Sequence, residues 1–88
     1  MKNTDFIKRN TFSIVVGKVN NSAIRMLRFY VFRNNHDGTY TSVKGYHRGS
    51  TYTSFWVRDN RFTPRTYTAG DLLERFNGCE FMDETSPY

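Results

Sequence analysis

The chain has 88 residues, of which 38% are hydrophobic and 17% aromatic, and its formal net charge is +5. This length holds one hydrophobic core, so residues 1–88 are expected to form a single small domain. A pI near 9.7 favours an acidic partner. The candidates are an acidic protein surface, a nucleoprotein and a nucleic acid. Solubility alone is the competing explanation of the charge.

Cysteine usage and apolar content exclude several classes of protein. Cys79 is the single cysteine, which rules out an internal disulfide framework and a cysteine-based zinc cluster. The first five residues lack the apolar region of a signal peptide, and no apolar run approaches membrane-spanning length. A cytoplasmic protein without membrane contact is therefore expected.

The N-terminal third of the chain predicts an arm followed by two strands. Residues 1–10 are expected to form an arm or a short helical turn, and Thr11 to Val19 alternates like a half-buried strand. Residues 24–33 carry apolar side chains on both faces, which favours a central strand over the competing helix at 23–32. Residues 34–38 then predict a hairpin turn ending in Asp37-Gly38.

A short internal echo follows the hairpin. Thr39-Tyr40-Thr41-Ser42 recurs as residues 51–54, which predicts two successive strands joined by a turn at 46–50. Residues 59–65 are expected to form a loop fixed by Pro64.

The last quarter of the chain predicts one helix. Thr68 and Asp71 have the spacing of a helix-capping pair, and Leu72, Leu73 and Phe76 form an apolar stripe. Gly78 is placed to end the helix in a left-handed conformation. Residues 79–82 are expected to add an edge strand, and residues 83–88 an acidic tail.

Together these elements predict an α+β fold. It consists of a four- to five-stranded antiparallel meander sheet followed by one C-terminal helix packed on one face. One short helix covers only one face, so the other face is expected to be solvated, closed as a barrel or held against a partner.

The sequence contains no recognisable catalytic constellation, so an enzyme is not expected. His36 and His47 flank the predicted third strand, about 25 Å apart at strand spacing, too far to act on one phosphate. Cys79 and the His36-Asp37 pair have no further metal ligand at short spacing, and no glycine-rich phosphate loop occurs. No cofactor and no metal are therefore expected.

A basic, aromatic sheet face is the candidate binding site. If Tyr40, Lys44 and Tyr46 share an exposed face with Tyr52 and Trp56, they form a stacking platform of the kind found in proteins that bind single-stranded RNA or DNA. If that face is buried, the same rings are core. The candidate binding residues are Arg25, Arg28, Arg33, Tyr40, Lys44, Tyr46, Tyr52, Trp56 and Arg58.

Three functions compete for this sequence. The first is a small non-enzymatic basic binding protein that docks on a larger macromolecule and modulates or inhibits it, as phage or mobile-element proteins for host takeover or anti-defence do. The second is a sequence-tolerant nucleic-acid-binding protein, and the third is a small nuclease-type toxin.

The charge is unevenly distributed along the chain. Residues 1–66 contain 12 Lys or Arg and 3 Asp or Glu, which gives a net charge of +9. Residues 67–88 contain one Arg and five Asp or Glu, which gives −4. The acidic tail is therefore expected to screen the basic sheet, so that deleting residues 83–88 strengthens binding.

Overall fold

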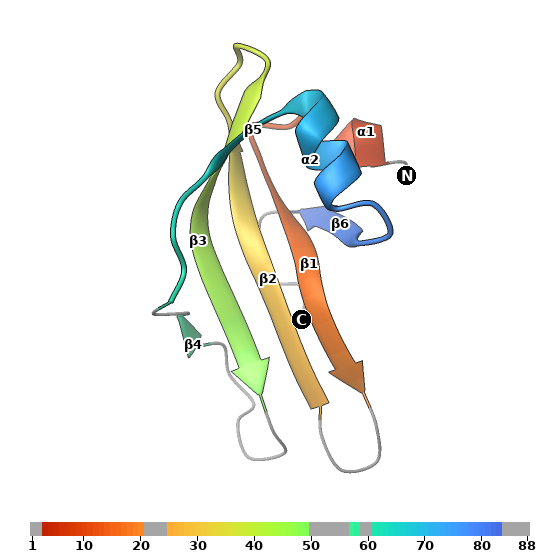
Figure 1. Ribbon diagram of the computed structural model, residues 1–88, viewed down its shortest axis with the longest axis vertical. Helices are drawn as coiled ribbons and strands as arrows, with labels where there is room; N and C mark the ends of the chain where they lie inside the picture. Colours follow the sequence, from red (N-terminus) through yellow and green to blue (C-terminus); the bar gives the residue numbers. More distant parts are fainter. Residues whose placement is uncertain (1–2, 21–24, 50–56, 59–60, 84–88) are drawn as a thin grey trace.

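The computed structural model describes residues 3–20, 25–49, 57–58 and 61–83 (Figure 1). Two helices and six strands occur in these ranges, and the expected α+β fold is confirmed. In chain order they are α1 (Asn3–Phe6), β1 (Thr11–Asn20), β2 (Arg25–Asn34), β3 (Thr39–Gly49), β4 (Val57–Arg58), β5 (Thr66–Thr68), α2 (Ala69–Arg75) and β6 (Glu80–Asp83).

All strand pairs in the sheet are antiparallel, in the order β4-β3-β2-β1-β6. β5 stands outside this path and pairs with residues 39–41 of β3, whereas β4 pairs with residues 46–47 of the same strand. β4 and β5 therefore follow one another along the edge of β3 that faces away from β2. Residues 61–65, which precede β5, run beside that edge.

β2 is the central strand, as its two apolar faces predict. Phe32 is fully buried on the face that α2 covers, whereas Phe29 and Val31 are buried on the opposite face. The opposite face is therefore not simply solvated, because Val15 and Leu27 complete a second buried cluster there. Alternation along one strand supplies both cores because successive side chains point to opposite faces.

The larger core lies between the sheet and α2. Phe12 stacks on Phe32 with ring centroids 5.6 Å apart and on Phe81 at 6.0 Å. Leu72 of α2 and Phe76, the residue that caps its C-terminal end, belong to this cluster, and both are buried. Large rings thus fill a core in which aliphatic side chains are few.

The predicted signals at the two ends of α2 are confirmed. The Asp71 backbone N–H donates to Thr68 Oγ1 at 3.2 Å, so Thr68 caps the first turn. Gly78 has φ +84°, the left-handed conformation expected after a helix. β5, the three-residue strand that ends in this cap, was not anticipated, because its hydrogen bonds to β3 are long-range.

Two β-bulges change which residues share a face. β1 shifts register between Val15 and Gly17, and β3 shifts at Val43, opposite the Val31–Phe32 step of β2. The predicted turn at 46–50 is wrong, because β3 continues to Gly49. The echo at residues 51–54 lies outside the described residues.

The C-terminal strand ends one residue later than predicted. Asp83, expected to begin the tail, belongs to β6 and forms an ion pair with Arg9. β6 adds to the free edge of β1, as predicted, and residues 84–88 lie outside the described ranges. α1 confirms the helical turn expected near the N-terminus.

Candidate functional site

A groove of about 750 Å³ opens on the half of the sheet that α2 leaves uncovered. Figure 1 shows why: α2 crosses one end of the sheet, while β1, β2 and β3 continue well beyond it. The groove has the size of many ligand sites. Its lining residues are Val16, Gly17, Lys18, Met26, Leu27, Arg28, Tyr30, His47, Arg61, Arg75, Phe76 and Cys79. We call this the basic groove.

The floor of the basic groove is the continuation of the helix-side face of β2. Tyr30 contacts the α2 core, and Arg28 and Met26 follow at the same alternation toward the far end of the strand. The bulge in β1 places Gly17 opposite Arg28. Because glycine has no side chain, the floor stays open at this point.

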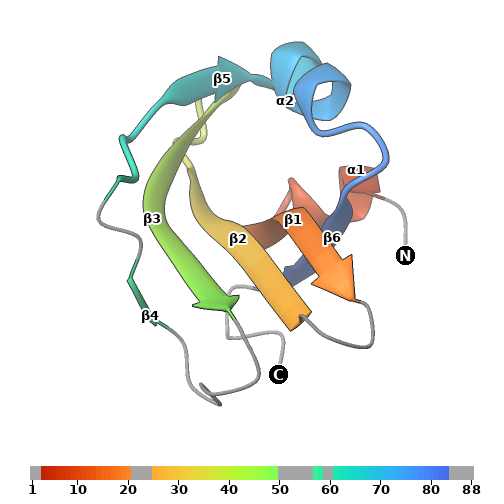
Figure 2. The same cartoon turned by 60° about the horizontal axis from the view of Figure 1, so that its bottom comes forward.

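One wall is formed by residues 61–65, which precede β5. The backbone of Arg65 accepts a hydrogen bond from the Ser42 N–H at 2.9 Å, and its own N–H donates to Ser42 Oγ at 3.0 Å. Phe62 covers Gly45 so closely that a Cβ there would lie 2.8 Å from the Phe62 ring, and that ring packs on Tyr30 at 5.3 Å. These contacts hold Arg61 and Arg65 beside the sheet (Figure 2 shows the segment curving past β3).

The other wall is the C-terminal end of α2. Arg75 and Phe76 line the basic groove there, and Cys79 follows after the helix. A smaller pocket of about 250 Å³ adjoins the groove and shares four lining residues with it. It is lined by Tyr30, Ser42, Arg61, Phe62, Thr63, Arg65, Tyr67, Arg75 and Phe76. We call it the end pocket.

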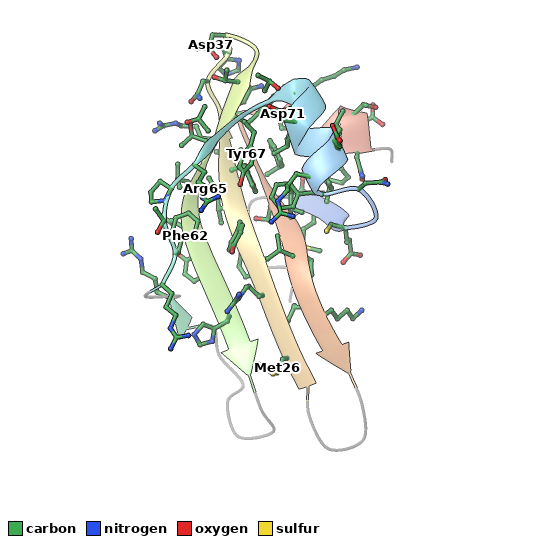
Figure 3. The ribbon with its side chains drawn as sticks, in the orientation of Figure 1. Met26, Asp37, Phe62, Arg65, Tyr67 and Asp71 are labelled. Carbon is green, nitrogen blue, oxygen red and sulfur yellow. The ribbon has the colours of Figure 1, made fainter. Side chains whose placement is uncertain are left out.

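The described residues that line these two cavities carry charge of one sign. Their described lining contains five Lys or Arg residues and one histidine and includes no Asp or Glu. The basic residues are Lys18, Arg28, Arg61, Arg65 and Arg75, with His47 beside them. Cations lining a concave surface focus a positive potential, so the arrangement attracts an anionic ligand. Figure 3 shows Arg65 over the sheet beside Tyr67, with Met26 near the far end of β2.

Of the nine predicted binding residues, Arg28 lines the basic groove. Arg33 and Lys44 are exposed elsewhere, Tyr40 is buried in the α2 core, and Tyr46 stacks on Phe29 at 5.3 Å. Arg58 is exposed on β4, paired with Tyr46. The side chains of Arg25, Tyr52 and Trp56 lie outside the described part of the structure.

The β3 bulge explains why the predicted platform does not form one face in this strand. Tyr40 and Ser42 face α2, but the extra residue at Val43 turns Lys44 and Tyr46 to the opposite side. Strict alternation, on which the prediction depended, holds only within each half of the strand.

Sequence reasoning missed most of the groove. Arg61 and Arg65 stand in a segment that the sequence predicts only as a loop, and Arg75 lies within the predicted helix, where no binding role is expected of it. The excess of +9 in residues 1–66 was the one available signal, and it does not say which cations converge. Their convergence depends on the long-range attachment of residues 61–68 to β3.

The two histidines lie in different settings. His36 has φ +60° in the hairpin, and its Nε2 is 2.9 Å from Asn10 Oδ1, whereas His47 lines the basic groove. No cluster of three or more His, Cys, Asp or Glu suited to a metal ion occurs among the described residues. Neither helix within the described ranges has the length and apolarity needed to span a membrane.

Comparison of the chain with protein-family models, with curated proteins and with solved structures finds no match.

Proposed function

We propose that the protein is a non-enzymatic binding protein that takes single-stranded nucleic acid into the basic groove. The observation that carries the proposal is the described lining of the two cavities, which combines five Lys or Arg residues with aromatic rings and includes no carboxylate. Phosphodiesters supply a regular series of negative charges, and arginine binds them through paired N–H donors.

The aromatic part of the lining supports nucleotides as the ligand rather than simple anions. Tyr30 and Phe62 are each half-buried, so part of each side chain stays accessible; Tyr30 lines both cavities and Phe62 lines the end pocket. A base stacked on such a ring contributes about 1–3 kcal/mol to binding with little sequence preference.

The shape of the site favours a single strand over a duplex. The bases of a duplex are stacked within it, out of reach of rings on the floor of a groove. Unpaired bases enter such a site and stack, while the backbone follows the cations along the walls.

Docking on a protein partner, the other class of function expected from the sequence, has less support. Interface hot spots are typically Trp, Tyr and Arg side chains grouped in well-packed, desolvated pockets near the centre of the interface. Among the described residues, Met26 is the one large hydrophobic side chain classed as exposed, at 50%.

Fluorescence anisotropy with a labelled oligonucleotide of about 12 nucleotides tests the proposal, since this length is within the range of known single-strand sites. We expect the single strand to bind more tightly than the matching duplex. Arg75→Ala should weaken binding, because Arg75 lines both cavities. Lys44→Ala is the matched control, because Lys44 is exposed on the opposite face.

Absence of binding at low salt overturns the proposal, as does an equal loss in the two variants. RNA or DNA cleaved under these conditions would instead identify a nuclease.

A further inference from the structure

This inference rests on the proposed function and concerns the end pocket. We propose that the end pocket binds the terminal phosphate monoester of a single strand, so that the protein recognises a phosphorylated end. The chemistry recognised is a phosphate with one ester bond and about two negative charges.

On the side away from the basic groove, the end pocket is bounded by packed aromatic rings. Tyr67 packs on Phe76 at 5.6 Å and on Phe32 at 6.0 Å, which fills the space between β5 and α2. Beyond Ser42, β5 is hydrogen-bonded to β3. A strand lying in the groove therefore meets a barrier at this point, and the group that enters the pocket is the end of the strand.

The described lining of the end pocket suits a phosphate monoester. Three arginines line it: Arg61, Arg65 and Arg75. A phosphate monoester carries nearly two negative charges and a diester carries one, so three cations favour the monoester. Tyr67 and Thr63 add hydroxyl groups, which complement the arginine N–H donors. A cavity of about 250 Å³ is small, and it is lined mostly by polar side chains.

The position of the end pocket relative to the rings supports the same assignment. Tyr30 and Phe62 line it, packed on one another at 5.3 Å, and Tyr30 also lines the basic groove. A terminal nucleotide with its phosphate in the pocket therefore places its base beside these rings. The rest of the strand then continues into the basic groove, which shares Arg61 and Arg75 with the pocket.

The test compares three forms of the same oligonucleotide, with a 5′-phosphate, a 3′-phosphate or hydroxyl groups at both ends. We expect one phosphorylated form to bind about tenfold more tightly than the hydroxyl form, which corresponds to about 1.4 kcal/mol. The form that gains identifies the end that is recognised. DNA and RNA versions show whether the sugar contributes.

Variants of Arg65 connect the preference to the pocket. Arg65 lines the end pocket and is not among the residues that line the basic groove. Arg65→Ala should therefore abolish the end preference while the hydroxyl form still binds. Arg65→Lys should restore only part of it, because lysine lacks the paired N–H donors. Lys44→Ala should keep the full preference, and circular dichroism spectra confirm that each variant is folded.

The outcomes separate this inference from the proposed function. Equal affinity for all three forms overturns end recognition and leaves single-strand binding intact. An end preference that survives Arg65→Ala also overturns it, because the phosphate is then bound elsewhere. Failure of every form to bind overturns both proposals.

Discussion

The close approach of Phe62 to Gly45 gives a sharp test of how the groove wall is held. A Cβ at Gly45 would lie 2.8 Å from Phe62 Cδ2 and 3.0 Å from Phe62 Cβ, so Gly45→Ala must displace the ring. Gly17→Ala is the matched control. Its new Cβ would lie 3.7 Å from the nearest atom, Arg28 Cβ, which is an ordinary contact.

The expected magnitude follows from the difference between these two variants. Each replaces a strand glycine, and each gains about 0.5–1 kcal/mol because alanine loses less backbone entropy on folding. Only Gly45→Ala has the cost of overpacking, which is about 1–3 kcal/mol. The shared gain cancels, so Gly45→Ala should be about 1–3 kcal/mol less stable than Gly17→Ala.

Thermal unfolding followed by circular dichroism measures this difference. For a domain of this size each kcal/mol corresponds to about 4–8 °C in Tm. Gly45→Ala should also weaken oligonucleotide binding, because Phe62 lines the end pocket. Equal melting temperatures for the two variants would refute the packing of Phe62 on Gly45.

Three further predictions concern single side chains. Thr68→Ala removes the cap on the Asp71 N–H and should lower stability by about 1 kcal/mol by thermal unfolding, whereas Thr68→Ser should not; equal losses would contradict the cap. The Thr39 hydroxyl and the Thr39 backbone N–H both donate to the Asp37 carboxylate and lower its pKa from the ordinary value of 3.8; the hydroxyl has the larger effect. The contribution of these hydrogen bonds to the stability of the fold is present above pH 3.8 and is lost as the pH falls through the lowered pKa of Asp37. Thr39→Val should raise the pKa of Asp37 measured by carboxyl NMR, and an unchanged titration would contradict the hydrogen bond from the Thr39 hydroxyl. Cys79 lines the basic groove, so saturating oligonucleotide should slow its alkylation, and an unchanged rate would place the ligand elsewhere.

Local patterns in the sequence predict most of the fold. The Thr68 cap and Gly78 mark the ends of α2, because capping depends on residues a few positions apart. The double apolar pattern of β2 predicts a central strand, because burial on two faces leaves no polar alternation. These features depend on neighbours in sequence, and the structure confirms them.

The groove depends on features that local patterns do not reveal. The bulge at Val43 moves Lys44 and Tyr46 away from the face that Tyr40 occupies, and alternation alone gives no sign of it. Arg65 reaches the site because its backbone bonds to Ser42, 23 residues earlier. Contacts between such distant residues are set by the packing of the whole domain.

The salt dependence of oligonucleotide binding tests the central proposal most directly. Each cation that contacts a phosphate of a single strand contributes about −0.7 to the slope of log K against log salt. The five Lys or Arg residues described in the two cavities therefore set a slope of about −3.5 when all make contact.

Replacing Arg65 and Arg75 together by alanine should reduce the steepness by about 1.4, and Lys44→Ala should leave the slope unchanged. This result would place the nucleic acid across the basic groove and the end pocket, because Arg75 lines both cavities and Arg65 lines the end pocket. A slope that is the same in all three proteins, or a reduction by Lys44→Ala equal to that of the arginine pair, would contradict the account.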